Sequence, residues 1–495
     1  MALTKATNRM TTGAQINIKD FESLKVGTDW QPAIQAAIDS LDTGDDTTTG
    51  GVVYFPVGRY YIESPIIVRT THSSGLASIT LQGEGLHNTV IDCASNFSGT
   101  QAILVEDSTY CTFKDFHVLV NSRAQYGLEL KGGNEITVER VFCQNAITSC
   151  FYVHRCFMVT MNQCRAKGGV TQFDFGGAYN TSLNIMNCYA SRSEADRGIG
   201  QGFLIRYVAY STFTACGADF TGRWGYRVSN TLGVTFNNCG AEKTERAAWY
   251  FEASHALDTA TDADSGNTIV DHCRCVLNGC VSSIADTNNA SDAGALVSNG
   301  YGAIYSNNVA ALEGETLSSI DVEINRFNEI GDPALDSIYS VVSTGVDTNH
   351  KVSLNGCKFT GAIISTVAVI DPIDVTRVNN LAVTGANTSV VDLANVFGSS
   401  NNYSGILNIL ATHGTPTSGT QYNSAAYVLL VTKSAGSATI VEIAKNGLTT
   451  GGSTNHPSFT WTLDSTNNEL EASPVGTTSG NFYFYIGQIG SLSPS

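Results

Sequence analysis

Charge is scarce in this chain. Charged residues make up 14% of its 495 residues, and acidic residues outnumber basic ones by 44 to 27, which gives a formal net charge of -17. Proteins that bind nucleic acid or anionic membranes usually present clustered Lys and Arg, so this balance argues against both partners. A negatively charged substrate would have to meet the basic residues that cluster between Arg192 and Arg246.

Long apolar runs are also missing. No stretch approaches the ~20 apolar residues of a membrane span, and the opening MALTKATNRMTTGAQINIKDF lacks the apolar core of a secretory signal. Cysteine, by contrast, is frequent, with 13 residues. The count is odd and there is no secretory signal, so the pattern favours reduced thiols over disulfides.

Proline is rare, with 9 residues, and helical patterns are rarer still, whereas 48 Gly and many Asn, Ser and Thr separate short apolar runs. Such a composition suits many tight turns and argues against a helical bundle. The exception is TDWQPAIQAAIDSL (Thr28 to Leu41), whose apolar residues recur at helical spacing behind a possible cap at Thr28 or Asp29. We expect this helix to cover the open end of the structure that follows.

A cysteine-bearing segment recurs along the middle of the chain. FTACGADFTGRWGYRVSN (Phe213 to Asn230) is followed by FNNCGAEKTERAAWYFEAS (Phe236 to Ser254), and similar segments lie upstream. Such a repeat of short alternating strands is typical of a solenoid, here a parallel β-helix with one coil per repeat. We expect one cysteine of each coil to stack about 4.8 Å from the next as a buried column. The cysteines in matching places, at intervals of 21, 24, 28, 23 and 34 residues, are Cys143, Cys164, Cys188, Cys216, Cys239 and Cys273.

Each coil has a second strand, such as FDF (Phe173 to Phe175) or FLIR (Phe203 to Arg206). Because strand side chains alternate between faces, the large apolar residues should point inward and a polar row outward. This row comprises Glu129, His154, Asp174, Arg206, Arg227 and Glu252. The turns after the cysteines concentrate further charged and aromatic residues: Arg192, Glu194, Asp196, Arg197, Asp219, Arg223, Trp224, Glu242, Lys243, Glu245, Arg246 and Trp249.

The expected fold is all-β: a right-handed parallel β-helix (β-solenoid) of roughly a dozen coils, with an N-terminal capping helix and a C-terminal β-sandwich domain. We divide the chain into an extended lead-in over residues 1–18, the capped β-helix over 19–398 and the sandwich over 402–495. The last segment loses the coil period and reads as separate strands, among them AAYVLLVTK, SFTWTLD and NFYFYIGQIG.

The capping helix, GGVVYFPVGRYYI, QGEG and the Asn- and Cys-rich coils together resemble the pectate-lyase-like β-helix family, and within it bacteriophage tailspikes. This resemblance covers about residues 8–390. It implies a homotrimer in the virion tail that binds and cleaves a surface polysaccharide of the host bacterium. It also implies a C-terminal domain for trimerisation or carbohydrate binding.

Two departures from the tailspike pattern are visible. The family's long particle-anchoring head is missing, so we expect residues 1–18 to dock onto another phage tail or adaptor protein. The usual DGxTDDT before the helix is replaced by LKVGTDW, which should leave the fold intact.

Glycoside hydrolysis needs two carboxyl groups, about 5–5.5 Å apart for retention of configuration or 6.5–9.5 Å for inversion. Asp219 and Glu242 occupy the same slot, CGAD and CGAE, on consecutive coils, and are the first candidates for the catalytic pair. Glu245, Asp196 and Asp174 are near enough in the repeat to replace either. Candidate substrate-binding residues are the arginines, which could bind a sugar carboxylate or sulfate, and the tryptophans, which could stack on a sugar: Arg192, Arg206, Arg223, Arg227, Arg246, Trp224 and Trp249.

A structural interpretation competes with the catalytic one for each of these residues. Acids in solenoid turns usually hydrate the surface, tryptophans usually pack in the wall, and Arg227 and Arg206 could pair with Glu252 and Asp174. Two other functions also stay open. One is a polysaccharide lyase, in which a base such as Lys243 or Arg246 takes the proton next to a uronate carboxylate, and the other is a receptor-binding spike without catalysis.

No cofactor or metal is expected. DTATDADSGN (Asp258 to Asn267) lacks the spacing of a calcium loop, and Cys273, Cys275 and His272 are too close together in the sequence for a zinc site.

Overall fold

The computed structural model describes residues 15–41, 50–69, 78–177, 179–191, 200–244, 247–253, 272–284, 304–308, 319–330, 339–345, 350–357, 362–365, 369–371, 377–383, 388–392, 403–413, 423–434, 437–449, 459–464, 469–474 and 480–491. The chain divides into two compact units. The first contains residues 1–352 and 358–369, and the second contains residues 353–357 and 370–495.

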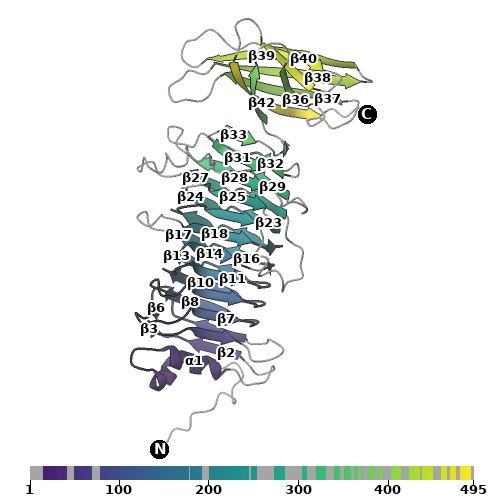
Figure 1. The fold of residues 1–495 in the computed structure, drawn as a ribbon. Helices are drawn as coiled ribbons and strands as arrows, with labels where there is room; N and C mark the ends of the chain where they lie inside the picture. The colour runs from purple at the N-terminus through teal and green to yellow at the C-terminus, as the bar shows by residue number, and fades with distance from the viewer. Residues whose placement is uncertain are drawn as a thin grey trace, which may run out of the picture. The chain divides into compact units, whose positions relative to one another are not determined.

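The first unit is a parallel β-helix, drawn from purple to green in Figure 1. One wall, here called wall B, is an 11-stranded parallel sheet to which each coil contributes one strand. Its strands follow each other in chain order: β4 (Ile66–Arg69), β7 (Gln101–Glu106), β9 (Tyr126–Lys131), β11 (Ser149–His154), β14 (Thr171–Phe175), β18 (Gln201–Arg206), β22 (Tyr226–Ser229), β25 (Trp249–Ala253), β28 (Ile304–Asn308), β31 (Tyr339–Gly345) and β33 (Ala362–Ser365).

The remaining strands of the β-helix form a 23-stranded sheet, here called wall A. They are β1 (Gln15–Asn17), β2 (Gly50–Tyr54), β3 (Gly58–Ile62), β5 (Ser78–Gln82), β6 (Thr89–Cys93), β8 (Thr112–Leu119), β10 (Thr137–Gln144), β12 (Thr160–Asn162), β13 (Arg165–Lys167), β15 (Asn180–Thr181), β16 (Asn184–Met186), β17 (Tyr189–Ser191), β19 (Val208–Ala209), β20 (Thr212–Thr214), β21 (Gly217–Asp219), β23 (Thr231–Asn237), β24 (Gly240–Thr244), β26 (His272–Asn278), β27 (Val281–Ile284), β29 (Ser319–Asn325), β30 (Asn328–Ile330), β32 (His350–Asn355) and β34 (Val369–Asp371).

A short helical cap covers the start of this unit. It consists of the 3-10 helix η2 (Ile18–Leu24) and the α-helix α1 (Gln31–Asp39), which turns Ala33, Ile34 and other apolar residues inward. The Gln35 side chain accepts a hydrogen bond from the Ile67 N–H at 2.9 Å and donates one to the Ile67 carbonyl at 2.8 Å. Since Ile67 lies on the edge strand β4, the helix satisfies backbone groups that would otherwise be open to another chain. The expected capping helix is confirmed.

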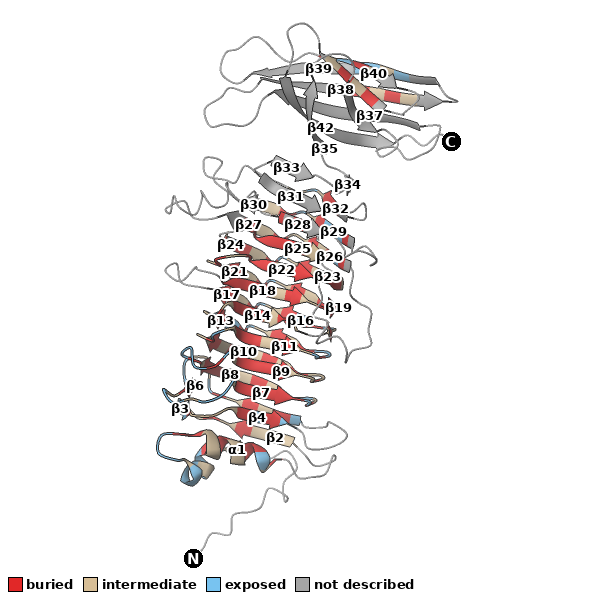
Figure 2. Cartoon of the chain, viewed as in Figure 1, coloured by how far each residue is buried: buried red, intermediate tan, exposed pale blue. Residues whose placement is uncertain are grey.

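Inward-facing aromatic rings form a stacked ladder behind wall B. The centroids of Phe151 and Phe173 are 4.9 Å apart, and the series continues through Phe203 and Tyr226 to Trp249 at 4.8, 4.8 and 4.0 Å. Figure 2 shows the matching red band of buried residues along the walls. Strand alternation points these rings into the core, and their stacking adds to the stabilisation from the area that each ring buries.

The cysteine column is present. The N–H groups of Tyr189, Gly217 and Gly240 donate to the carbonyls of Cys164, Cys188 and Cys216 in the preceding coil at 2.9, 2.9 and 2.8 Å. The thiols donate in turn to carbonyls one coil back, as from Cys164 to Val138 at 3.4 Å. The residue before each column cysteine adopts a left-handed conformation, so every coil bends at this point: Gln163, Asn187, Ala215, Asn238 and Gly279.

Two members of the expected column were assigned wrongly. Cys143 aligns with Ala166, and Cys273 aligns with Thr231, so neither lies in the stack. Cys280 follows Cys239 instead, because the Val281 N–H donates to the Cys239 carbonyl at 2.9 Å. The interval between cysteines does not tell which half of a wall A strand a cysteine occupies, and this explains both errors.

The second unit contains two antiparallel sheets. One has the order β35 (Arg377–Val383), β42 (Gly480–Ser491), β37 (Tyr403–His413), β38 (Asn423–Ser434) and β39 (Ser437–Thr449), and the other has the order β36 (Thr388–Asp392), β41 (Glu469–Pro474) and β40 (Phe459–Asp464). Antiparallel pairing therefore begins at residue 377, before the expected boundary near residue 402. A sandwich needs two such sheets, and their packing face to face stays a prediction.

Candidate active site

Asp219 and Glu242 lie side by side on wall A. The parallel register pairs Asp219 of β21 with Glu242 of β24, and Ala218 with Ala241. The two alanines are buried, so alternation turns both carboxylates outward. Asp219 is partly buried and Glu242 is exposed. Their backbones are one strand spacing apart, ~4.8 Å. The shared slot inferred from CGAD and CGAE is therefore present.

Tyr189 completes this group. Its hydroxyl donates a hydrogen bond to Asp219 Oδ2 from β17, one coil earlier. Its ring lies over Gly217, where a Cβ atom would be 3.1 Å from the Tyr189 ring carbon Cδ2. Gly240 aligns with Gly217 on the next strand, so two neighbouring rungs lack side chains beside the carboxylates. Side chains from neighbouring coils fill both positions: the Tyr189 ring covers Gly217, and a Cβ atom at Gly240 would be 3.2 Å from the Val281 methyl carbon Cγ2.

Burial is the main reason why the pKa of Asp219 is raised above its ordinary value. The Glu242 carboxylate raises it further, whereas the Tyr189 hydroxyl and the Lys243 cation lower it. Burial and the bond to Asp219 also raise the pKa of Tyr189, so this phenol stays a donor. An acid that keeps its proton beside an ionised partner is the arrangement that glycosidases use.

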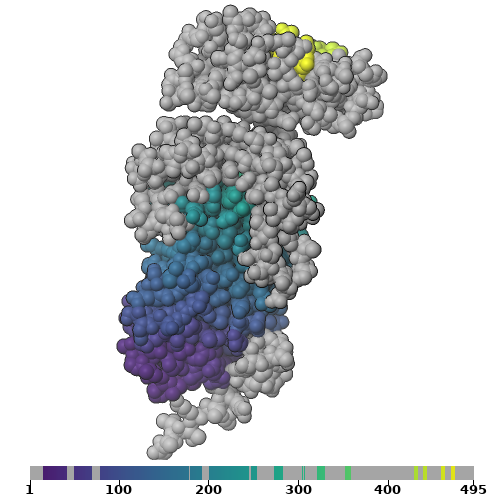
Figure 3. All heavy atoms as spheres, viewed as in Figure 1, coloured from purple at the N-terminus to yellow at the C-terminus, as the bar shows by residue number. Residues whose placement is uncertain are grey.

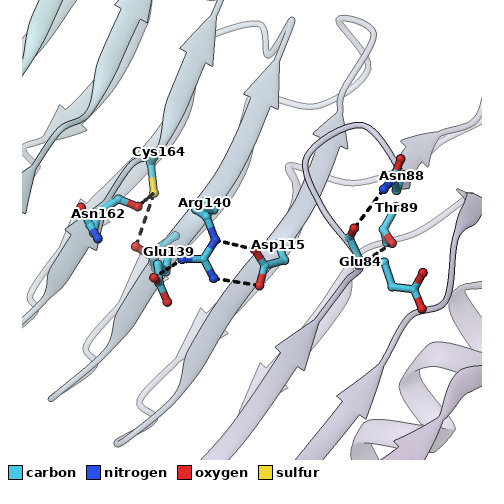
Figure 4. Close-up of polar contacts among 9 residues, drawn as sticks. Glu84, Asn88, Thr89, Asp115, Glu139, Arg140, Asn162 and Cys164 are labelled. Atoms are coloured by element: carbon cyan, nitrogen blue, oxygen red, sulfur yellow. Dashed lines mark hydrogen bonds and ion pairs between the residues drawn. The ribbon is translucent and has the colours of Figure 1, made fainter.

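Asp115, also on wall A, is an example of an acid with a structural role. Arg140 Nε and Nη2 bind Asp115 Oδ1 and Oδ2 at 2.6 and 3.0 Å, and Glu139 also contacts Arg140 (Figure 4). This fork joins two adjacent coils and neutralises the carboxylate. Within the described part of the chain, Asp219 and Glu242 have no such ion pair.

The two candidate tryptophans lie in packed surroundings. Trp249 is fully buried in the aromatic ladder, because its position on β25 faces inward, and the expected role as a sugar platform is wrong for this conformation. Trp224 is 6% exposed and stacks on Tyr250 with a centroid distance of 4.4 Å, so it has little free face. Arg223, in the same turn, is partly exposed.

The outward row on wall B is present as expected. Arg227 binds Glu252 Oε2 through Nε and Nη2 at 3.1 and 2.8 Å, which confirms the structural interpretation for this arginine. His154 Nε2 and Glu129 Oε1 are 2.9 Å apart. Asp174 and Arg206 lie between these pairs on β14 and β18 and do not form an ion pair with each other.

Four candidates lie outside the described residues: Arg192, Asp196, Glu245 and Arg246. Tyr189 is the residue that sequence reasoning missed. It directly follows a column cysteine, in the slot where the next two coils have Gly217 and Gly240, and this contrast was the available signal. Among the described residues, no group of three or more His, Cys, Asp and Glu could hold a metal ion. No described helix is long and apolar enough to cross a membrane.

Comparison with known proteins agrees with this architecture. Residues 15–248 match the family model described as rhamnogalacturonase A/epimerase, pectate lyase-like. No curated protein matches the chain.

Solved structures with similar coils include three polysaccharide-related proteins. A mutant tailspike of E. coli bacteriophage HK620 in complex with a pentasaccharide is 13% identical, with a TM-score of 0.49 over 96% of this chain and 93% of that one. The A-module of mannuronan C-5 epimerase AlgE4 from Azotobacter vinelandii is 16% identical, with a TM-score of 0.44 over 72% and 100%. Tailspike gp49 from Acinetobacter baumannii bacteriophage Fri1, a capsular polysaccharide depolymerase, is 10% identical, with a TM-score of 0.36 over 96% and 86%.

At these TM-scores the three structures carry no conclusion about the site. The family match rests on the sequence itself and covers the coils that hold Asp219 and Glu242. Figure 3 shows these coils following one another in chain order from purple to teal. Together with the parallel register of both walls, the match shows that residues 15–248 form a pectate-lyase-like β-helix.

Proposed function

We propose that this protein is a bacteriophage tailspike that binds a capsule or O-chain polysaccharide of its host and hydrolyses internal glycosidic bonds with Asp219 and Glu242. The pectate-lyase-like family match and the tailspike resemblance of the sequence support a glycan as substrate. In the same proposal the protein is a homotrimer in the virion tail, attached through its N-terminus to another tail protein. The C-terminal unit serves trimerisation or carbohydrate binding.

The register of Asp219 with Glu242 is the observation that carries this proposal. It brings together two acids 23 positions apart in the sequence, next to a tyrosine donor and two glycines. Surface acids without a catalytic role do not need a raised pKa or a neighbouring carboxylate, and Asp219 has both.

The proposed roles follow from burial. Asp219, with its raised pKa, holds a proton and donates it to the glycosidic oxygen as the bond to the leaving sugar breaks. The exposed Glu242 carboxylate attacks the anomeric carbon and forms a glycosyl ester. Water then attacks this ester and gives its proton to Asp219, so both carboxyl groups return to their starting states. One strand spacing is nearest to the separation used for retention of configuration.

The direct test is incubation of the protein with the surface polysaccharide of the host strain. We expect new reducing ends and a ladder of saturated oligosaccharides by mass spectrometry. Glu242→Gln and Asp219→Asn should each lose at least about a hundredfold in cleavage rate, as expected for loss of acid–base or nucleophilic groups, with binding retained. Glu84→Gln, which changes an exposed acid elsewhere on the β-helix (Figure 4), is the matched control and should cleave normally.

Unchanged turnover in both Glu242→Gln and Asp219→Asn would discard the pair. Binding without any shortening of the polysaccharide by the wild-type protein would favour a receptor-binding spike without catalysis.

A lyase is the second candidate, because Lys243 lies next to the same acids and its positive charge acts on Asp219. In that reaction Lys243, in its neutral form, would take the proton next to a uronate carboxylate, and the sugar bond would break by elimination. The products would then carry a carbon–carbon double bond that absorbs in the ultraviolet. Lys243→Ala would abolish cleavage by a lyase but not by the hydrolase.

A further inference from the structure

Two exposed cations lie on wall A near the acid pair. The register pairs Lys167 of β13 with Ser191 of β17, and Ser191 with Asp219 of β21, so Lys167 belongs to the same row as the acids. Ala166 is buried, so alternation turns both Arg165 and Lys167 outward, where both side chains are exposed. The backbone at Lys167 therefore lies two strand spacings, ~10 Å, from that at Asp219 on one outer surface.

The ring of Phe142 supports the Arg165 side chain. The guanidinium carbon Cζ lies over this ring, 5.6 Å from its centroid, and the ring stacks in turn on His117 at 4.5 Å. A guanidinium held by a ring face keeps its N–H donors available at the edge of its plane. On the following coil Arg165 aligns with Tyr189, the phenol that donates to Asp219. Burial raises the pKa of Tyr189, whereas the charge of Arg165 acts to lower it.

Several outward cations of the β-helix bind a carboxylate of a neighbouring coil: Arg59 with Asp92, Lys131 with Glu106, Arg140 with Asp115 and Arg227 with Glu252. Within the described part of the chain, no carboxylate forms an ion pair with Arg165 or Lys167. Their partners in register on the coils before and after are uncharged: Phe142, Gln144, Tyr189 and Ser191. In a chain with 44 acidic and 27 basic residues, these two cations form a local excess of positive charge.

We propose that Arg165 and Lys167 bind a sugar carboxylate of the polysaccharide, on the same wall as the acid pair. The substrate is then an acidic polysaccharide, which runs along wall A across the coils from β13 to β24. This inference rests on the proposed function. It adds the chemical class of the substrate and a binding position outside the acid pair.

The geometry of the two cations suits a carboxylate. Alternate residues of a strand lie ~7 Å apart, so the long side chains of Arg165 and Lys167 can converge on one group. The guanidinium offers two parallel N–H donors to the two oxygens of a carboxylate, and the ammonium adds a further donor. A bound anion also reduces the repulsion between the two cations, which a neutral sugar would leave in place.

The test is calorimetric binding of the host polysaccharide, in its native form and after chemical reduction of its carboxyl groups to alcohols. Full-length Glu242→Gln protein serves as the parent, since it should leave the polysaccharide intact. Adding Arg165→Gln or Lys167→Gln should each weaken binding of the native polysaccharide about tenfold, as for a lost hydrogen bond to a charged group. Added salt should reduce this difference, because salt screens exposed charges.

Arg274→Gln in the same parent is the matched control. Arg274 is an exposed cation on β26 of the same wall, and its Nε lies 3.9 Å from Asp321 Oδ2. The variant changes the net charge by the same amount and should bind as the parent does. With the reduced polysaccharide, the parent should bind as weakly as the variants at positions 165 and 167 bind the native form. Circular dichroism of each variant checks that the β-helix is intact.

Unchanged affinity in both Arg165→Gln and Lys167→Gln overturns the inference, as does an equal loss in Arg274→Gln. Either result leaves the proposed hydrolase standing, because cleavage by the wild type is measured separately. A loss in both variants that carboxyl reduction does not reproduce would assign the site to a sulfate or phosphate ester and overturn the carboxylate. If the wild type binds the native polysaccharide through these cations without shortening it, the hydrolase fails and the binding position is supported.

Discussion

At the scale of single residues, the pKa values of two acids are raised for different reasons. Asp219 has a raised pKa because it is partly buried next to Glu242, and a tyrosine hydroxyl partly offsets this effect. Asp174 has a raised pKa chiefly because it is buried. The environment of Asp219 suits proton donation to a substrate. At Asp174, loss of the proton lowers the free energy of unfolding, because the buried carboxylate is then charged.

Tyr189→Phe tests how the tyrosine hydroxyl contributes to the pKa of Asp219. The variant keeps the ring over Gly217 and removes the hydrogen bond that lowers the pKa of Asp219. The acid should then hold its proton to higher pH, so the basic limb of the kcat/KM profile should move to higher pH. A profile identical to that of the wild type would show that Asp219 is not the acid.

Asp174→Asn tests the second acid through stability. The folded-state pKa of about 6 exceeds the ordinary value of 3.8, so the native state binds the proton more tightly than the unfolded state does. The free energy of unfolding of the wild type should therefore fall as pH rises from about 4 to about 6 and stay lower above it. Asn carries no charge, so the variant should gain on the order of 2 kcal/mol relative to the wild type at pH 7 compared with pH 4.

Denaturant unfolding of both proteins at the two pH values measures this difference. An equal gap between variant and wild type at pH 4 and pH 7 would mean that Asp174 does not titrate in this range.

At the scale of elements, the stacked rows of side chains stabilise the coils. Phe203 lies in the middle of the ladder, 4.8 Å from both Phe173 and Tyr226. Phe203→Ala should cost about 3–5 kcal/mol of unfolding free energy through lost burial and a cavity. Tyr210→Ala, which changes a tyrosine that is 65% exposed, should stay within about 0.5 kcal/mol. Thermal unfolding of both variants measures this difference. Equal melting temperatures for Phe203→Ala and Tyr210→Ala would contradict the stabilising role of the aromatic ladder.

The elements also show how far the sequence could be read. The helical spacing of the apolar residues from Thr28 to Leu41 predicted the helix cap. The repeat predicted four cysteines in one column and the shared slot of Asp219 and Glu242, since each of these follows from a fixed position after a bend. It misplaced Cys143 and Cys273, because coils differ in length and period alone does not fix which half of a strand a cysteine occupies. The expected place of Trp249 among the exposed turn residues is wrong, because strand alternation turns its side chain into the core.

At the scale of the whole molecule, composition predicted the all-β solenoid and the change of architecture near the C-terminus. The exact boundary was not accessible, since β35 pairs with β42 about a hundred residues later and its sequence resembles a coil strand. The tyrosine at position 189 was missed for a related reason: its role depends on a neighbour from the adjacent coil.

The most direct measurement of the central claim is a crystal structure of Glu242→Gln with an oligosaccharide of the host polysaccharide. We predict a glycosidic oxygen within hydrogen-bond reach of Asp219, with the anomeric carbon facing the side chain at position 242. An oligosaccharide bound with its glycosidic bonds far from β21 and β24 would contradict the account.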